Sequence, residues 1–547
     1  MSAPSPHRPP RTRTAVLLAV LAAVAAGLGM LVLVRADAGL TARQVTVGGV
    51  PMTEVRAGPP TPGVRRPGVV IVHGFAGSAQ LMRPIADTVA RRGAVALLFD
   101  FAGHGANPAR LPGAGSNTSA ATLAADLDVA VGYLRSRSDV DADGIVLVGH
   151  SMGAGAVTRY AAGHPEIART VAISLPEAGE LPPGRPTELL LIVGGAEFPA
   201  FRRAADDAAR RGASTGRRSV VVVPGVEHIS VLFAARTHRE IADWLPGGDG
   251  TARPRPVARL AGAALLVFAF GIGVVPLAAL LLPRRASGRR PTEPPSDREP
   301  DAPVPTASPA PPGSPAPPGS PAPGGTALSG VPFGGLSLLA LAVLVAVVGA
   351  AVAAVLPTAR LPLAVGGYVA GFLLVTGVLL VAGQRWLPGW FGVIRPPPGA
   401  PVSAGRRATA RTAVATLALT GYAVLAVALP IHLGLTSALP VGARWWLLPL
   451  VAGACLLFLL GVELVAAGRT GRHLLVVAVT VVVLTASTLV GLAPGFVVLV
   501  VPLFALLLGW QAAWATVLRR YAGPRWLPAV LGAALVGWPI ATTLPLS

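Results

Sequence analysis

The sequence predicts two structural classes in one chain: an α/β domain with a mostly parallel sheet and helices on both faces, and an all-α bundle of transmembrane helices. Short apolar strands alternate with helical segments between residues 40 and 247, which is the pattern of a parallel sheet. Long uncharged apolar runs lie before and after this region. The 547 residues are 52% hydrophobic and 13% charged, whereas soluble domains are about one quarter charged.

The first membrane segment is predicted at residues 15–34, after a cytoplasmic tail formed by residues 1–14. Residues 15–34 carry no charge and are numerous enough to span a bilayer. Arginines precede this run, and positively charged flanks stay in the cytoplasm. A cleaved signal peptide is the alternative, because Ala36-Asp37-Ala38 resembles a cleavage site. We favour the uncleaved anchor, and both interpretations place the following domain, residues 40–247, outside the cell.

Two apolar strands are predicted at residues 69–72 and 94–99. The first ends in His73-Gly74-Phe75-Ala76-Gly77-Ser78, and the second ends in Asp100-Phe101-Ala102-Gly103-His104-Gly105. A helix is predicted for residues 120–135, because leucine and valine recur there at helical spacing.

A candidate nucleophile follows the apolar strand of residues 145–148. This strand runs into Gly149-His150-Ser151-Met152-Gly153, and residues 154–162 are predicted to form a helix. A sharp strand-to-helix turn would expose the serine hydroxyl, and the flanking glycines allow the backbone to bend. The start of the helix offers free N–H groups to a developing oxyanion. A tight turn without chemistry is the alternative, but the strand and the helix on either side favour a nucleophile.

These motifs together resemble the α/β-hydrolases over residues 40–247. The resemblance implies that the backbone N–H groups of Phe75 and Met152 form the oxyanion hole. It also implies that the turn at Asp100 shapes the floor of the site, and that His73 and His104 are structural residues inside loops typical of the family.

The resemblance places the base directly after the last strand of the sheet. Residues 220–223 form a predicted strand, which is followed by Pro224-Gly225-Val226-Glu227-His228. A nucleophilic serine needs a base, and the base needs an acid that fixes its tautomer. We therefore assign His228 as the base and expect His164 and His238 to be solvated.

The acid is predicted at Glu197. A strand at residues 189–193 leads into Gly194-Gly195-Ala196-Glu197, where the resemblance implies an acid that is more often aspartate. Asp206 and Asp207 follow in a helical stretch and are expected on a solvated face. Glu177, which follows the preceding strand, is a further candidate.

The site is expected to be open. Many lipases and peptidases of the family insert a helical lid between the strand at residues 170–175 and the strand that starts near Glu188. Here only about a dozen residues, rich in proline and glycine, separate these strands. The domain therefore resembles the compact dienelactone hydrolases and small esterases, which have no lid.

No cofactor and no metal are implied. The run Asp139-Val140-Asp141-Ala142-Asp143-Gly144 mimics the start of a calcium loop, but His150 occupies the twelfth position, where an EF-hand needs glutamate. We interpret this run as a polar turn before the nucleophile strand. Cys455, the only cysteine, lies in a predicted span, so the exported domain has no disulfide.

Eight further spans are predicted after the domain, which makes nine with the first. Arginines gather in alternate connecting loops, and this pattern predicts a cytoplasmic N-terminus and an outward C-terminus. Arg253, Arg255 and Arg259, which precede the second span, do not fit the pattern. The second span covers residues 260–282, and a bundle of seven helices at residues 336–545 contains the spans 336–356, 361–382, 412–434, 446–467, 474–493, 496–517 and 526–545.

Residues 286–333 are rich in proline, alanine, serine and glycine and are predicted to form a disordered cytoplasmic linker. The net charge of +20 comes from arginines that are spread over tails and loops. Such spacing indicates contact with anionic membrane lipid. It does not favour nucleic acid as a partner, which needs a concentrated basic face. The arginine- and alanine-rich composition is typical of a GC-rich bacterial genome, such as an actinobacterial one.

The sequence thus predicts a multi-pass membrane protein with a serine hydrolase domain at the outer face of the cell membrane. Ser151, His228 and Glu197 would cleave an ester or related acyl bond in a small-molecule or lipidic substrate. The alternatives are an acyltransferase or peptidase acting on the cell envelope, and a transport or scaffold protein whose hydrolase domain only binds. Glu463, the only carboxylate in a predicted span, lies near a cytoplasmic end, which favours a platform over a transporter.

Overall fold

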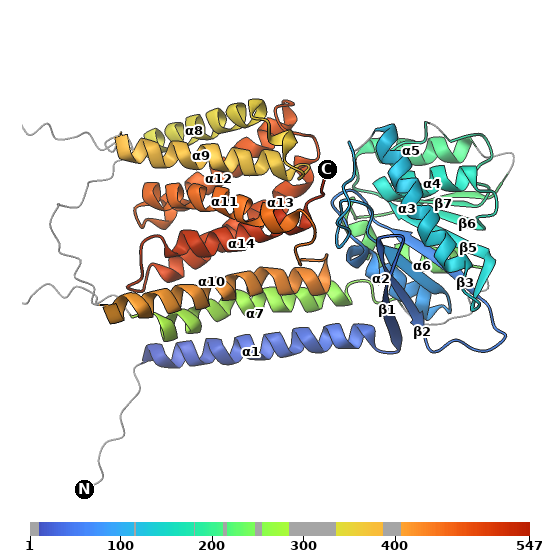
Figure 1. The fold of residues 1–547 in the computed structure, drawn as a ribbon, viewed down its shortest axis with the longest axis horizontal. Helices are drawn as coiled ribbons and strands as arrows, with labels where there is room; N and C mark the ends of the chain where they lie inside the picture. The colour runs from blue at the N-terminus through green and yellow to red at the C-terminus, as the bar shows by residue number, and fades with distance from the viewer. Residues whose placement is uncertain are drawn as a thin grey trace, which may run out of the picture.

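The computed structural model describes residues 10–113, 116–179, 181–211, 216–246, 254–283, 335–386 and 406–547. An α/β domain lies at one end of a bundle of long helices, and the two parts are in direct contact (Figure 1). The predicted linker at residues 286–333 lies outside the described residues. The first helix already begins at Pro10, within the predicted tail of residues 1–14.

The α/β domain is built on one sheet of eight strands in the order β1-β2-β4-β3-β5-β6-β7-β8. All neighbouring strands from β4 to β8 are parallel, which confirms the prediction of a mostly parallel sheet. The strands are β1 (Leu40–Val47), β2 (Val50–Ala57), β3 (Arg66–Val72), β4 (Val95–Phe99), β5 (Val140–His150), β6 (Arg169–Ile173), β7 (Leu189–Gly194) and β8 (Arg218–Val223).

Two features of the sheet differ from the prediction. An antiparallel hairpin of β1 and β2 precedes the predicted strands, and its turn is made by Gly48 and Gly49, both with positive φ. Residues 140–144, predicted as part of a polar turn, instead form the first part of β5. There Val140 pairs with Arg66, and the register shifts before the apolar half of the strand because of a bulge.

Helices cover both faces of the sheet, as predicted. Met82, Ile85 and Ile241 from α2 and α6 pack on one face, and Leu127 and Val157 from α3 and α4 pack on the other. The helices of the domain are α2 (Ala79–Arg91), α3 (Asn117–Arg135), α4 (Met152–Gly163), α5 (Pro199–Arg210) and α6 (Ala235–Trp244).

Eight helices in the described part of the chain are long and apolar enough to cross a membrane. A ninth apolar helix occupies the last predicted span but has only 17 residues, or about 26 Å at 1.5 Å per residue. The helices are α1 (Pro10–Asp37), α7 (Ala258–Leu281), α8 (Gly335–Val355), α9 (Gly366–Trp386), α10 (Arg406–Gly434), α11 (Arg444–Ala466), α12 (Thr470–Leu489), α13 (Val497–Leu518) and α14 (Leu527–Thr543).

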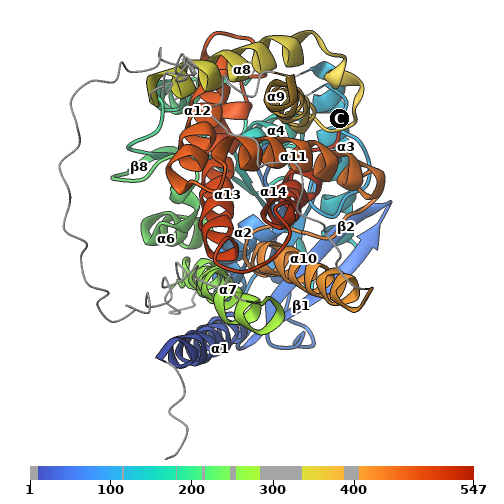
Figure 2. The ribbon, with the colours of Figure 1, turned by 90° about the vertical axis from the view of Figure 1, so that its left-hand side faces the viewer.

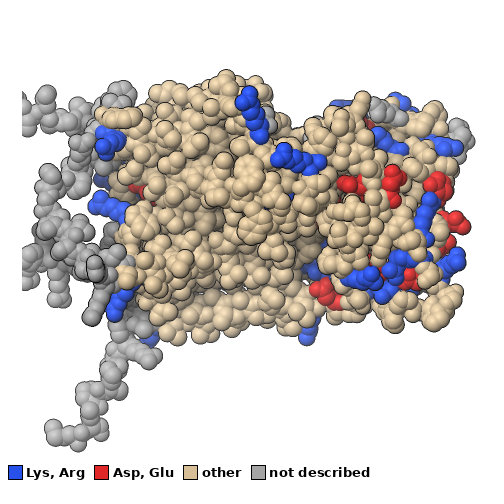
Figure 3. All heavy atoms as spheres, viewed as in Figure 1, with Lys and Arg blue, Asp and Glu red and all other residues tan. Residues whose placement is uncertain are grey.

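The bundle helices run from the α/β domain to a far end, and α1, α7 and α10 lie side by side along one flank (Figures 1 and 2). On the face shown in Figure 3, the middle of the bundle carries almost no charge, whereas charged side chains gather on the α/β domain and at the far end. The ends of α11 and α13 and the starts of α12 and α14 meet at the far end. Arginines flank these termini: Arg469, Arg472, Arg519, Arg520 and Arg525.

Candidate active site

Ser151 lies on a sharp turn between β5 and α4. Its φ of 52° is in the left-handed region, which is rare for a residue with a side chain. Glycine is required on both sides: a Cβ at Gly149 would lie 2.3 Å from the carbonyl oxygen of Gly153, and a Cβ at Gly153 would lie 2.5 Å from that of His73. The Ser151 N–H donates to the Ile173 carbonyl at 2.9 Å, which ties the strained turn to β6. The hydroxyl is therefore presented at the carboxyl edge of the sheet.

The structure brings Ser151, His228 and Glu197 together in one hydrogen-bonded chain. The Oγ of Ser151 lies 3.1 Å from His228 Nε2, and His228 Nδ1 lies 3.0 Å from Glu197 Oε2. Both ring nitrogens of the histidine are thus engaged. The ring of Phe201, on α5, packs against the imidazole with a centroid distance of 4.6 Å.

The Glu197 carboxylate is held on its other side as well. Its side chain is only 1% exposed, and its Oε1 accepts hydrogen bonds from Ser174 Oγ and the Gly194 N–H, both at 2.7 Å. Ser174 follows β6 and has a φ of 55°. No sequence motif indicates Ser174, because its role depends on the contact between two neighbouring strand ends.

The other acid candidates lie elsewhere. Asp206 and Asp207 pair with Arg202 and Arg210 along α5, on its exposed side. Glu177 is exposed in the segment after β6. Among the predicted carboxylates, Glu197 is the one that contacts the histidine.

His150 is a second residue that sequence analysis missed. It lies between Gly149 and Ser151, is 2% exposed, and its Nε2 lies 2.9 Å from the His228 carbonyl oxygen. Burial, together with the nearby His228, lowers the pKa of His150 to about 3, so its ring is neutral near pH 7. A neutral ring donates from Nε2 to that carbonyl, which fixes the loop that carries His228. In the sequence, the signal for this role was the position of His150 between Gly149 and Ser151.

The two residues predicted for the oxyanion hole lie at the same edge of the sheet. Met152 is the first residue of α4, and the first N–H groups of a helix have no carbonyl partner within it. Phe75 follows β3, and the next residue, Ala76, has a φ of 58°, which turns the chain sharply.

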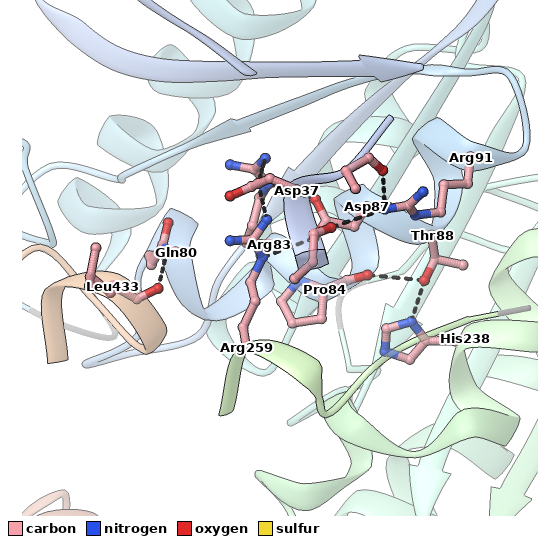
Figure 4. A network of polar contacts seen from close by, with 12 residues as sticks. Asp37, Gln80, Arg83, Pro84, Asp87, Thr88, Arg91, His238, Arg259 and Leu433 are labelled. Carbon is pink, nitrogen blue, oxygen red and sulfur yellow. Dashed lines mark hydrogen bonds and ion pairs between the residues drawn. The ribbon is translucent and has the colours of Figure 1, made fainter. Parts of the chain in front are cut away.

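The predicted structural histidines are both fully buried. His73 Nδ1 lies 2.8 Å from the Gly74 carbonyl, and its Nε2 accepts the Phe101 N–H at 3.1 Å, so it joins the loops after β3 and β4. Burial lowers the pKa of both His73 and His104. The expectation of a solvated His238 was wrong: the ring is buried and contacts Thr88 Oγ1 at 2.6 Å, because α6 packs against α2 (Figure 4).

The bundle borders the site on the side of Phe75. No helix interrupts the described residues between β6 and β7, in line with the absence of a lid insertion. The ring of Phe75 instead packs on Phe496, at the start of α13, with a centroid distance of 4.3 Å. The open site therefore stays a prediction for the β6–β7 side, whereas on the side of Phe75 the bundle lies against the domain.

The loop after β4 is bound to the last residues of the chain. Leu546 donates its N–H to the Gly103 carbonyl at 2.7 Å and accepts the N–H of Leu111 at 3.0 Å. The fully buried Arg444, at the start of α11, donates from Nη2 to the carbonyls of Gly103 and Leu544. Beyond the end of α14 at Thr543, Leu544 therefore bonds to Arg444 and Leu546 pairs with the α/β domain.

A cluster of four charged residues joins two bundle helices to α2 (Figure 4). Arg83, on α2, pairs with Asp87 at 2.7 Å and with Asp37, at the end of α1, at 3.0 Å. Arg259, near the start of α7, pairs with the same two aspartates. Arg259 was one of the arginines that did not fit the predicted topology, and its charge is balanced here by carboxylates.

Comparisons with known proteins agree with this architecture. Residues 67–215 match the family model described as the alpha/beta hydrolase fold. The sheet order, the turn at Ser151 and this match define the class: the chain contains a domain with the α/β-hydrolase fold, joined to a bundle in which eight of the described helices are long and apolar enough to cross a membrane.

Two curated proteins from strains CDC 1551 / Oshkosh and H37Rv of Mycobacterium tuberculosis, both described as uncharacterized, are 33% identical to this chain over 151 residues. The match covers 27% of this chain and 50% of each relative, so the chain spans about half the length of the curated relatives it matches.

Among solved structures, a dienelactone hydrolase from Anabaena variabilis is 23% identical, with a TM-score of 0.29; the match covers 41% of this chain and 94% of that one. An esterase from Pyrococcus furiosus is 19% identical, with a TM-score of 0.29, over 38% of this chain and 91% of that one.

Proposed function

We propose that the protein is a membrane-anchored serine hydrolase that cleaves an ester or related acyl bond. The observation that carries this proposal is the hydrogen-bonded chain from Glu197 through His228 to Ser151. A nucleophile, a base and an orienting acid within hydrogen-bond reach are the requirement for covalent acyl transfer.

The reaction proceeds in two steps. The Ser151 Oγ attacks the acyl carbonyl carbon while His228 Nε2 takes the hydroxyl proton, and the N–H groups of Phe75 and Met152 bind the oxyanion. The C–O bond to the leaving alcohol breaks as His228 returns the proton. Water then attacks the acyl-serine by the same route and releases the carboxylic acid, and Glu197 supports the imidazolium in both steps.

The hydrolase domain faces the cell exterior in this proposal. Its support is the arginine-flanked far end of the bundle, because positively charged residues next to spans remain in the cytoplasm. Near the hydrolase domain, Arg259 is paired with Asp37 and Asp87.

Fluorophosphonate labelling of the full chain in membranes tests the proposed chemistry. We expect labelling of the wild type and none of Ser151→Ala, together with a loss of ester turnover of about 10⁶-fold, as for removal of a nucleophile that acts in a unit with its base. Asp206→Asn is the matched control, because this side chain pairs only with Arg202 on an exposed helix face. Labelling that persists in Ser151→Ala would refute the assignment.

A further inference from the structure

The loop that carries a proposed oxyanion donor, residues 73–78, lies between the nucleophile and the membrane bundle. On one side, a Cβ at Gly74 would lie 2.9 Å from His150 Nδ1 and 3.0 Å from Ser151 Cβ, so the loop backbone packs directly on the nucleophile turn. On the other side, the half-buried ring of Phe75 packs against the apolar core of the bundle. The position of this loop relative to Ser151 therefore depends on both parts of the molecule.

Two contacts at different points of the loop join it to different bundle helices. The ring of Phe75 packs on Phe496, the residue before α13, with a centroid distance of 4.3 Å. At the end of the loop, Ser78 Oγ donates to the carbonyl of Leu435, directly after α10, at 2.9 Å. Among the described side chains that border the apolar core of the bundle, Phe75 is the one that comes from the hydrolase domain.

Ser78 also connects the loop to α2, the helix behind it. Its Oγ accepts the Leu81 N–H at 3.2 Å and so caps the start of α2, while the same hydroxyl donates to Leu435. Gln80 Nε2 donates to the carbonyl of Leu433, in the last turn of α10, at 2.9 Å (Figure 4). The end of α10 thus bonds to two neighbouring residues at the start of α2, which fixes the end of the loop.

The loop has a backbone conformation that needs such support. Ala76 has a φ of 58°, in the left-handed region that is unfavourable for a residue with a Cβ. Strained conformations of this kind persist where the surrounding structure holds them. The Gly77 N–H donates to the Gly74 carbonyl at 2.9 Å and closes the turn, and the contacts of Phe75 and Ser78 hold it on either side. An oxyanion donor is effective only when its N–H points at the developing charge, so the placement of this turn bears directly on catalysis.

The loop after β4 supports the same ring from a second direction. The ring of His104 packs edge-on against Phe75, with a centroid distance of 5.7 Å. The carbonyl of the preceding residue, Gly103, accepts a hydrogen bond from Arg444 on α11 at 3.0 Å. Phe75 therefore lies between a bundle residue, Phe496, and a hydrolase loop that is itself bonded to the bundle.

We propose that the membrane bundle positions the oxyanion loop of the hydrolase, and that Phe496 is the positioning residue on its side. This inference rests on the proposed function. Phe496 acts through Phe75: the packing of the two rings fixes the Phe75 side chain and with it the adjacent backbone N–H. The bundle is then needed for turnover itself, in addition to holding the domain at the membrane.

The test is Phe496→Ala in the full chain in lipid nanodiscs, with p-nitrophenyl butyrate as the substrate. We expect kcat to fall about tenfold, less than the roughly 10²-fold to 10³-fold loss that follows removal of an oxyanion donor. KM is expected to stay unchanged, because the affected interaction is made in the transition state. Fluorophosphonate labelling carried to completion counts the competent sites, so kcat per labelled site distinguishes a misplaced loop from a loss of folded protein.

Two further variants serve as controls. Phe496→Tyr keeps the ring that packs on Phe75, and Phe496 is 46% exposed, so the added hydroxyl can reach water. Leu499→Ala removes a similarly exposed apolar side chain, 42% exposed, from the same helix. For both variants, kcat per labelled site is expected to stay within about twofold of the wild type.

The outcomes separate the two proposals. If the wild type is neither labelled nor active, the proposed function fails and the positioning role with it. If the wild type is labelled and active but Phe496→Ala keeps its kcat per labelled site, only the positioning role is overturned. A raised KM with an unchanged kcat would overturn it in favour of direct contact between Phe496 and the substrate. An equal fall of kcat in Leu499→Ala would overturn it in favour of a general loss of packing around α13.

Discussion

The loop beside the proposed site and the far end of the bundle hold their ionisable side chains in different ways. Beside the site, Asp100 bonds to nearby backbone and accepts the N–H groups of Ala79 and Ala106. At the far end of the bundle, ionisable side chains bond to one another across helices. Glu463 accepts two hydrogen bonds from Arg519, and His473 Nε2 contacts Gln511.

This difference determines what a sequence can reveal. Strand ends position polar groups through local backbone geometry, so short motifs identify them. Contacts between helices depend on how the helices pack, which short motifs do not encode. Glu463 was therefore recognised as an unusual carboxylate in a span, but its partners His473, on α12, and Arg519, directly after α13, were not predicted.

After the nucleophile, the acid of the proposed triad gives the largest expected effect within the hydrolase domain. Glu197→Gln removes the anion that supports the imidazolium of His228 while it keeps the side-chain shape, and we expect turnover to fall on the order of 10⁴-fold. Glu197→Asp retains more activity, limited by its shorter reach. Steady-state ester hydrolysis measures both, and Asp207→Asn, on the exposed side of α5, is the control. A silent Glu197→Gln combined with a severe Glu177→Gln would place the acid after β6 instead.

The proposal places the hydrolase domain and the far end of the bundle on opposite sides of the membrane, and cysteine labelling in intact cells can test it. Ser136→Cys lies on the exposed surface of the hydrolase domain, and Gly471→Cys lies on the exposed first turn of α12, at the far end. An impermeant maleimide is expected to label Ser136→Cys at once and Gly471→Cys only after lysis. The native Cys455 is buried and serves as the internal blank. The reverse pattern would invert the proposed topology.

The charged cluster between the two regions gives the smallest expected effect. Arg259 is 5% exposed, and Arg259→Met leaves Asp37 and Asp87 with Arg83 as their remaining partner in the cluster. We expect a loss of stability of about 2 kcal/mol, between the values for exposed and fully buried ion pairs. Thermal inactivation of labelling in nanodiscs measures it. Arg236→Met, which breaks the exposed pair with Glu240, is the control, and equal losses in both variants would contradict a role for the cluster in docking.

Much of the hydrolase fold could be predicted from the sequence. The strands before Ser151, Glu197 and His228 are continuous apolar runs, and the turn at Ser151 requires its flanking glycines for steric reasons. The β1–β2 hairpin was missed, although Gly48-Gly49 marks its turn, because its outer strand is largely exposed and carries no apolar run. Ser174 and His150 were missed because their partners lie on other strands and loops.

The relation of the bundle to the site could not be predicted. The contact between Phe75 and Phe496 joins residues that are far apart in the sequence, and neither phenylalanine has a neighbouring motif that indicates the other. The end of α14 at Thr543 could not be predicted either. The sequence of α14 is apolar enough for a longer helix, but Leu546 pairs with Gly103 and Leu111, which are far away in the sequence.

The pairing of Leu546 with the loop after β4 has a consequence for biogenesis. Ribosomes synthesise the hydrolase domain early, and in the proposed topology this domain is exported long before α14 emerges. Until then, the N–H of Leu111 is without the Leu546 carbonyl, and the carbonyl of Gly103 has Arg444, on the earlier helix α11, as a donor but not the Leu546 N–H. The loop beside the proposed site is therefore completed only when the last helix has been inserted, which couples the maturation of the hydrolase to the assembly of the whole bundle.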